Sequence, residues 1–479
     1  MATEVRRARA SFYTPQSLTT PLVLKALESQ VYDGPAQGAP RSAWRMRSVS
    51  ELLALKVCDP ACGAGAFLLE AGRYLAARVS EACPALASQA PELVVRHCLF
   101  GVDRDLDAVR LARLTLSCFA GKSAHLESRL CDVIRCDNAL FLDWWKCFPE
   151  VGRQGGFSVM LGNPPFHNAI EGRIAAEEKA ALRQRFPELG GTADYSYYFL
   201  ALVDGLLQST GTAGLVLPRA FLNAPAASKL RLRLNQTRPP SCIGCQDGAG
   251  PFLSAQVRIV ALVLGGSHAC VVGLSPPHSS VRLKTDNWWA DMQGGAEADP
   301  VAVPLGQRFE LQASMTTGMA YELRPFLEEQ PQGSQLRFVT AGLVDPGRCL
   351  WGAAPCRYLR RTFQYPRVRL DADMPPALYR RLMRIRRPKV LLAGVAGPGH
   401  RLEAFVDVEG IYCGAVSTFT ILDPQDDVGR LEDLCRYLNE ESVAQRVQGQ
   451  LGAAAMAAGL LTIPRRFLID LPIPLSYLN

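Results

Sequence analysis

The sequence is poor in histidine and has no long apolar run, and each absence excludes a class of protein. There are 6 His in 479 residues, and the one Cys-x-x-Cys pair, Cys242 and Cys245, has neither a second pair nor histidines at zinc spacing, so we expect no metal site. No apolar run approaches the roughly 20 residues that cross a bilayer, so we expect no membrane association. The first residues lack the apolar core of a secretory signal, so the 15 cysteines are expected to be reduced thiols in the cytoplasm.

Charge is also sparse, and what is present is nearly balanced. Charged residues make up 20% of the chain and hydrophobic residues 48%, which is typical of a globular protein, and 479 residues suggest two domains. The formal net charge of +7 is compatible with a polyanionic partner but does not require one.

A strand, a small-residue turn and a helix follow one another in the first half of the chain. The predicted strand 56–58 leads into the turn Asp59–Phe67, which contains Ala61, Gly63 and Gly65, and a helix is expected to Val79. Small residues let a nucleotide-like ligand approach the backbone closely. Because the turn has neither the Gly-x-Gly-x-x-Gly pattern nor the Lys-Ser/Thr of a phosphate-binding loop, NAD and ATP are poor candidates.

Acidic residues end the next two predicted strands. Strand 98–103 ends at Asp103, whose carboxylate can accept hydrogen bonds from both ribose hydroxyls of a nucleoside. Asp103 could instead cap the helix 106–120, although Asp105 is at least as well suited to that role. The strand 133–136 ends at Asp137, which Asn138 follows.

The stretch Asn163-Pro164-Pro165-Phe166 directly follows the apolar run 157–162, which predicts a buried parallel strand. Ligands of open α/β sheets bind at the carboxyl ends of the strands. There the Asn163 side-chain oxygen and the Pro164 carbonyl could accept both hydrogens of an exocyclic amine, while Phe166 could stack on the attached heterocycle. Taken alone, the four residues could equally be an ordinary strand-to-loop turn.

The chain has Phe-Tyr-Thr-Pro at 12–15, then the turn at 59–67, then Asn-Pro-Pro-Phe at 163–166. These motifs and their order resemble those of the γ-class N6-adenine-specific DNA methyltransferases of restriction-modification systems. Residues 59–67 resemble motif I and 163–166 resemble motif IV. The resemblance implies an α/β fold: a Rossmann-like S-adenosylmethionine-dependent methyltransferase domain followed by a C-terminal α+β target-recognition domain. We expect the catalytic domain at 1–265, a Gly/Ser/Pro-rich linker at 266–300 and the recognition domain at 301–479.

The resemblance also implies roles for individual residues. The residues expected to bind S-adenosylmethionine are Tyr13, Thr14, Asp59, Pro60, Ala61, Gly63, Gly65, Asp103, Asp137 and Asn138. Asn163, Pro164, Pro165 and Phe166 are expected to be catalytic, and Phe166 and Phe252 to stack on the target base. On the residues alone, Thr14 also suits an N-cap with Pro15 at the first helical position, and Phe252 is only an apolar residue ahead of a strand.

Basic residues gather in the second half of the chain. Between Cys356 and Lys389 there are 11 Arg and Lys residues against Asp371 and Asp373, with aromatic residues interleaved. Such a stretch predicts a surface that follows DNA phosphates, but it is also compatible with an ordinary solvated face. The candidate DNA-binding residues are Arg360, Arg361, Arg384, Arg386, Arg387 and Lys389.

Together these features predict methyl transfer from S-adenosylmethionine to the N6 amino group of adenine in double-stranded DNA, with the target base flipped out of the duplex. No PD-(D/E)xK cluster is recognisable, so any cognate restriction endonuclease is expected to be encoded separately, and we expect a monomer. Two alternatives stay open. Asn-Pro-Pro-aromatic also suits an RNA adenine or a protein glutamine amide, and a non-catalytic DNA-binding specificity protein could retain the fold.

Overall fold

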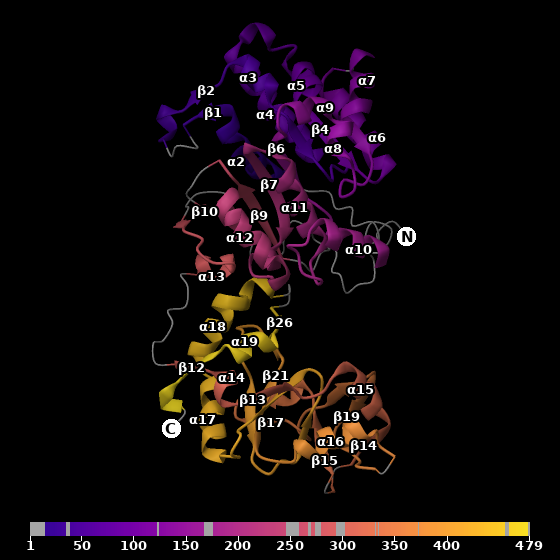
Figure 1. Cartoon of the computed structure of the whole chain (residues 1–479), viewed down its shortest axis with the longest axis vertical. Helices are drawn as coiled ribbons and strands as arrows, with labels where there is room; N and C mark the ends of the chain where they lie inside the picture. Colours follow the sequence, from indigo (N-terminus) through magenta and orange to yellow (C-terminus); the bar gives the residue numbers. More distant parts are fainter. Residues whose placement is uncertain are drawn as a thin grey trace. The chain divides into compact units, whose positions relative to one another are not determined.

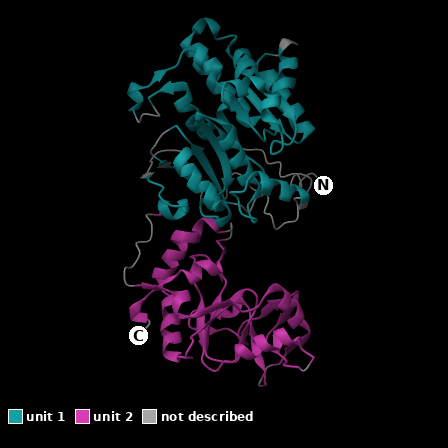
Figure 2. Ribbon diagram, viewed as in Figure 1, with its two compact units in different colours: residues 1–292 teal, residues 293–479 magenta. Residues whose placement is uncertain are grey.

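The structure is a computed structural model of the whole chain, and it divides into two compact units, residues 1–292 and 293–479 (Figure 2). The residues it describes are 15–34, 39–121, 124–166, 176–245, 258–266, 270–273, 279–293, 302–330, 332–333, 335–371, 373–455 and 459–477. None of the described helices is both long and apolar enough to cross a membrane.

The described strands of unit 1 form a nine-stranded sheet in the order β11-β10-β8-β9-β7-β6-β3-β4-β5 (Figure 1). Their bounds are β3 Val57–Asp59, β4 Leu99–Asp103, β5 Ile134–Cys136, β6 Phe157–Gly162, β7 Leu207–Pro218, β8 Pro240–Cys245, β9 Ile259–Leu264, β10 Cys270–Val272 and β11 Ser279–Val281. The five strands β7, β6, β3, β4 and β5 are parallel, whereas β9 runs antiparallel to both of its neighbours. A small hairpin, β1 Tyr32–Asp33 with β2 Arg45–Met46, lies apart from this sheet.

Helices of unit 1 connect and cover these strands. Their bounds are α2 Gln16–Val31, α3 Val49–Ala54, α4 Ala66–Ala82, α5 Ala90–Cys98, α6 Leu106–Phe119, α7 Ala124–Val133, α8 Trp144–Cys147, α9 Pro149–Arg153, α10 Ala176–Arg185, α11 Tyr195–Leu206, α12 Ser228–Thr237 and α13 Trp288–Met292. Packing of α2 against β7 and of α4 against β3 covers the middle of the sheet. All six residues of β6 are buried, as expected for a strand inside a covered parallel sheet.

One local prediction for unit 1 differs from the structure. Thr14 lies outside the described residues, and Pro15 directly precedes α2 instead of occupying its first position. A short 3-10 turn, Pro84–Leu86, separates α4 from α5, which begins at Ala90.

The expected linker 266–300 also needs correction. Its described residues include β10 and β11, which extend the sheet, and α13, whose Trp288 is buried with its ring 5.6 Å from that of Phe221. Unit 1 therefore continues to residue 292. The Gly-, Ser- and Pro-rich composition concealed these edge elements because each of them is only three to five residues long.

Unit 2 contains two four-stranded sheets, ordered β13-β25-β21-β23 and β14-β20-β15-β24. Its strands are β12 Ala302–Pro304, β13 Glu310–Ala313, β14 Leu327–Glu329, β15 Leu336–Val339, β16 Val344–Asp345, β17 Arg348–Cys349, β18 Cys356–Tyr358, β19 Arg361–Phe363, β20 Pro366–Val368, β21 Lys389–Ala393, β22 Val395–Ala396, β23 Ala404–Asp407, β24 Tyr412–Gly414, β25 Thr418–Leu422, β26 Leu461–Thr462 and β27 Pro472–Pro474. Its helices are α14 Leu305–Arg308, α15 Thr317–Leu323, α16 Pro376–Arg384, α17 Val428–Leu438, α18 Glu441–Leu451 and α19 Arg465–Ile469.

Each sheet of unit 2 has its own hydrophobic core. The first core joins β21 and β25 to α17, which begins after its N-cap Asp427 and buries Leu431, Leu434 and Leu438 at helical spacing. The second core joins β15 and β20 to α15, α16 and the hairpin β18–β19. Mixed strands and helices with two cores match the α+β organisation expected for this half.

Candidate active site

The carboxyl ends of four neighbouring parallel strands gather the predicted polar residues at one edge of the sheet. Asp59 is the last residue of β3 and Asp103 the last of β4, while Asp137 directly follows β5 and Asn163 directly follows β6. Because β5, β4, β3 and β6 lie side by side and run in one direction, these residues share an edge. The structure thus brings Asp59, Asp103, Asp137 and Asn163 to one edge of the sheet.

Hydrogen bonds fix the turn after β3 and leave part of its backbone uncovered. The Asp59 side chain accepts a hydrogen bond from the Ala61 N–H (2.9 Å), and the Cys62 N–H donates to the Val102 carbonyl of β4 (3.0 Å). Gly63 has a φ of +52°, which glycine adopts without strain, and a Cβ placed there would meet nothing within 4 Å. The turn therefore offers an open backbone surface of the kind that a nucleoside-containing cofactor needs.

Gly65 and Pro60 lie on the packed side of the same turn, and both are buried. Gly65, with a φ of +86°, precedes α4, and a Cβ added to it would lie 3.3 Å from the Cβ of Ala112 on α6. Gly65 therefore allows α4 and α6 to approach closely below the turn, which is a packing role.

Asp103 ties the turn to the second strand. Its two carboxylate oxygens accept from the Gly63 N–H (2.8 Å) and the Asp105 N–H (2.9 Å). Partial burial raises the pKa of Asp103, and these backbone hydrogen bonds oppose the rise. Asp105, and not Asp103, caps α6, so the capping alternative for Asp103 is wrong. Each carboxylate oxygen retains acceptor capacity for a ligand hydroxyl.

Asp137 and Asn138 form a small polar turn at the end of β5. The Asp137 N–H donates to the Asp103 carbonyl (2.9 Å), which connects the ends of β4 and β5. The exposed Asp137 carboxylate accepts from the Asn138 N–H (2.6 Å), and the Asn138 side-chain oxygen accepts from the Leu140 N–H (3.2 Å). Asp137 is thus held in place at the edge and open to solvent.

Asp59 lies in direct contact with the strand that carries Asn163. A Cβ added to Gly162 would come within 2.7 Å of the Asp59 Oδ1, so only glycine lets the end of β6 approach this closely. Asp59 is 1% exposed, and burial raises its pKa to about 8. The Asp59 carboxyl therefore lies between the turn after β3 and the end of β6 that leads into Asn163, which the sequence pattern did not indicate.

The four residues of the Asn-Pro-Pro-Phe stretch leave the sheet without regular secondary structure. Pro164 is buried, whereas Asn163, Pro165 and Phe166 are half-buried. The partial exposure of Asn163 and Phe166 is compatible with side chains that receive a ligand at the strand ends. Three predicted site residues, Tyr13, Thr14 and Phe252, lie outside the described residues.

Sequence reasoning missed a polar cluster beside this edge. Arg104 directly follows Asp103, and its Nη1 lies 3.4 Å from the Glu178 Oε1 of α10. The Tyr195 hydroxyl, at the start of α11, donates to the same Glu178 oxygen (2.8 Å), and burial is the main cause that raises the pKa of Tyr195. The cluster anchors α10 and α11 to the end of β4. Glu178 gave no signal because it is one of several charged residues in α10.

Known proteins share this arrangement of sequence and fold. Residues 97–246, which run from α5 to β8, match the family described as Eco57I restriction-modification methylase. A type II restriction enzyme and methyltransferase of Escherichia coli, RM.Eco57I, is 22% identical over 225 residues, which are 40% of this chain and 22% of that protein. The resemblance to the restriction-modification methyltransferases is therefore confirmed.

Solved structures extend the likeness of fold over most of the chain. The type IIL restriction-modification enzyme MmeI in complex with DNA has a TM-score of 0.58 at 13% identity, over 94% of this chain and 66% of that one. The DrdV–DNA complex has a TM-score of 0.55 at 12% identity, over 92% of this chain and 53% of that one. The predicted fold class is thus confirmed, and the chain spans about a fifth of the length of its curated relative, RM.Eco57I (22%).

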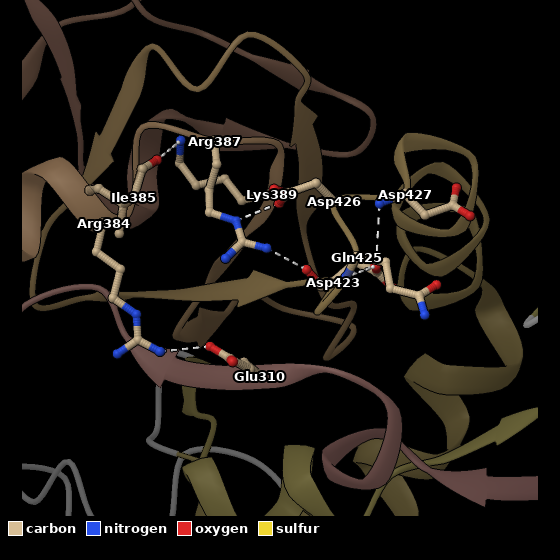
Figure 3. A network of polar contacts seen from close by, with 9 residues as sticks. All are labelled: Glu310, Arg384, Ile385, Arg387, Lys389, Asp423, Gln425, Asp426 and Asp427. Carbon is tan, nitrogen blue, oxygen red and sulfur yellow. Dashed lines mark hydrogen bonds and ion pairs between the residues drawn. The ribbon is translucent and has the colours of Figure 1, made fainter.

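The basic residues of unit 2, which are close in sequence, lie in different environments in the structure (Figure 3). Lys389 is 0% exposed, and its ammonium pairs with the buried Asp407 and donates to the Ile385 carbonyl (2.8 Å). Burial lowers the pKa of Lys389, and the contact with Asp407 opposes the shift. The prediction that Lys389 contacts DNA is therefore wrong, because its side chain lies in the core.

Two of the predicted DNA-binding arginines are paired within unit 2. Arg384 lies 2.7 Å from the Glu310 carboxylate, and Arg387 pairs with Asp426 and donates to the Asp423 carbonyl (2.7 Å; Figure 3). By contrast, Arg360, Arg361 and Arg386 are exposed and make no ion pair with any described residue.

Proposed function

We propose that the chain transfers a methyl group from S-adenosylmethionine to the N6 amino group of adenine in double-stranded DNA, as the modification component of a restriction-modification system. The observation that carries the proposal is the placement of Asn163, which follows β6 at the sheet edge where Gly162 contacts Asp59 of the cofactor turn. A target amine held by Asn163 would then lie next to a cofactor held by that turn.

The residues at the edge fit S-adenosylmethionine. The open face of Gly63 and the backbone around Ala61 would receive its methionine part, and Asp103 would accept hydrogen bonds from its ribose hydroxyls. In the turn that follows β5, Asp137 would accept from its adenine amino group, and Asn138 would lie beside it. From the resemblance, Tyr13 and Thr14 would complete the methionine end.

The chemistry asks little of the protein beyond positioning. The sulfonium of the cofactor supplies an activated methyl group. The adenine amino nitrogen is a poor nucleophile because its lone pair is delocalised into the ring. By accepting its two hydrogens, the Asn163 side-chain oxygen and the Pro164 carbonyl would favour a more tetrahedral nitrogen and aim its lone pair, so alignment supplies much of the rate. No strong base is needed, and Asn163 at this position favours adenine over cytosine.

Access to the target requires base flipping, because the amino group lies inside the duplex. Phe166, and Phe252 by resemblance, would stack on the flipped base and offset part of the stacking it loses. The MmeI and DrdV structures are complexes with DNA, which supports a DNA substrate here. We further propose that the chain acts as a cytoplasmic monomer and that any cognate restriction endonuclease is a separate chain.

The experiment that tests the proposal is nucleoside analysis. Duplex DNA, RNA and a protein mixture are each incubated with the chain and S-adenosylmethionine carrying an isotope-labelled methyl group, and the products are digested and identified by mass spectrometry. We expect label only in N6-methyldeoxyadenosine from DNA, and none with Asn163→Ala. Label in RNA or in glutamine would instead support the alternative substrates, and no label despite measurable cofactor binding would support a non-catalytic specificity protein.

A further inference from the structure

The hairpin formed by β18 and β19 in unit 2 has an unusual turn. Cys356 pairs with Phe363, Arg357 with Thr362 and Tyr358 with Arg361, so the turn consists of Leu359 and Arg360 alone. Both have positive φ, +45° and +66°. Asn-Gly is the favoured sequence for such a turn, because a Cβ is strained in the left-handed region. Two non-glycine residues there are a cost that is found most often at functional sites.

The base of this hairpin is firmly held. Cys356 and Phe363 are buried in the second core of unit 2. The Tyr358 ring lies 4.7 Å from that of Phe338, and its hydroxyl is 3.5 Å from the Ala320 carbonyl of α15. A rigid base with a strained two-residue tip presents the tip in a fixed position.

The hairpin is basic and its charges are not neutralised. Arg357, Arg360 and Arg361 are exposed, and none has an ion pair among the residues that the structure describes. Arg361 lies over the Phe363 ring at 4.9 Å, which orients it without neutralising it. Other arginines of unit 2 behave differently: Arg348 pairs with Asp345, and Arg369 pairs with both Glu328 and Asp371.

One carboxylate acts on the hairpin but is already engaged. The charge of Glu329 contributes to the raised pKa of Cys356, after burial, which is the main cause. The Glu329 oxygens accept hydrogen bonds from the backbone N–H groups of Gln364 and Tyr365. Its role is therefore to hold the chain that leaves β19, and the arginines keep their charge for an external anion.

We propose that the β18–β19 hairpin enters the major groove of the target DNA and determines part of the recognised sequence. Arg360, at the tip, would contact a guanine edge, and Arg357 and Arg361 would contact the flanking phosphates. A two-stranded ribbon fits the major groove, and Arg to guanine is the commonest specific contact there. The deep, narrow major groove of duplex RNA would not admit the hairpin. This inference rests on the proposed DNA substrate.

The test compares variants of the full chain by sequencing the DNA they methylate and by measuring DNA affinity over a series of salt concentrations. Leu359→Asn combined with Arg360→Gly keeps the turn, relieves its strain, removes the Arg360 side chain and replaces that of Leu359. Arg360→Ala and Arg357→Ala remove single charges. Arg348→Ala is the matched control, because Arg348 is exposed and follows a two-residue turn in a second hairpin, β16–β17, but is paired with Asp345.

We expect the double variant and Arg360→Ala to bind the wild-type site at least about tenfold more weakly and to accept any base at one or more positions of the methylated motif. Arg357→Ala should weaken binding to all sequences equally and reduce the salt slope by about one. The inference is overturned if the wild-type chain methylates DNA while the tip variants keep its motif and affinity within about twofold, as the control should. An unchanged motif and an unchanged DNA affinity are also what we would expect if the hairpin bound an acidic protein surface instead of DNA. If the wild-type chain methylates no DNA, the proposed function fails and the hairpin proposal fails with it.

Discussion

The candidate residues at the sheet edge of unit 1 and those in the basic stretch of unit 2 show opposite relations between closeness in sequence and position in the structure. Asp59, Asp103, Asp137 and Asn163 are far apart in sequence, yet all reach one edge because each ends or directly follows a parallel strand. In unit 2 the candidates are close in sequence, yet Lys389 is in the core, Arg384 is paired with Glu310, and Arg360 is exposed on a hairpin.

The difference shows which sequence features determine position. The strand ends of a parallel sheet are fixed by backbone hydrogen bonding, so a motif that follows a strand has a predictable location. A run of charge has no such constraint, because each side chain goes to whichever partner its own element brings near. The predictions below test the two regions against each other.

The largest effect is expected from Asn163→Ala at the sheet edge. Without the side-chain oxygen, one amine hydrogen of the target loses its acceptor, and we expect methyl transfer to fall by about 10³-fold or more, as when a single oriented polar group is removed from an active site. Calorimetry should show S-adenosylmethionine binding unchanged within about twofold. Asn235→Ala, in α12 and at no strand end, should leave both unchanged. Loss of cofactor binding in the Asn163 variant would mean that this residue belongs to the cofactor site.

In unit 2, Lys389→Met should destabilise the protein by about 3–5 kcal/mol, because it leaves Asp407 charged and buried without its partner. Urea unfolding measures the change. Lys389→Met with Asp407→Asn should recover much of it, because Asn removes the buried charge and keeps a side-chain oxygen as an acceptor for the backbone N–H groups of Ile411 and Tyr412. The control Arg401→Ala removes the exposed pair with Glu441 and should cost about 1 kcal/mol or less. A loss of DNA affinity in Lys389→Met without loss of stability would restore Lys389 as a DNA contact.

The Asp59→Asn variant tests whether the buried Asp59 carboxyl makes the stability of unit 1 depend on pH. Burial raises the pKa of Asp59 to about 8, whereas the unfolded chain releases this proton near pH 4. The contribution of Asp59 to stability is thus full below about pH 4 and is lost as the pH rises to about 8. Asn cannot ionise, so the melting temperature of the wild type relative to the variant should fall by a few degrees, about 2–4 °C, between pH 5.5 and pH 8.5. A constant difference would show that Asp59 stays ionised.

The smallest effect is expected from Arg384→Ala. Its exposed pair with Glu310 should contribute about 0.5 kcal/mol or less to stability, and because the charge is already neutralised, the methylated motif should not change. A change of motif as large as that expected for Arg360→Ala would show that pairing within unit 2 does not exclude an arginine from the DNA surface.

The sequence predicted which residues meet at the sheet edge of unit 1, because each of these residues ends or directly follows a strand. It located the strand before Asn163 correctly, and it left the cap of α6 open between Asp103 and Asp105, of which the structure has Asp105. It did not reveal that Gly162 contacts Asp59 or that Glu178 joins Arg104 to Tyr195, because both depend on contacts between distant segments. It also misplaced Lys389, since a basic residue that follows Arg386 and Arg387 and opens an apolar strand gives no sign of whether it has a buried partner.

The most direct test of the central claim is single-molecule sequencing of genomic DNA from a methylation-free host that expresses the chain, with the Asn163→Ala variant expressed in parallel. We predict that the intact chain modifies adenine at N6 within one sequence motif and that the variant leaves the DNA unmodified. Unmodified DNA with the intact chain, when cofactor binding has been measured separately, would contradict the assignment of DNA adenine as the substrate.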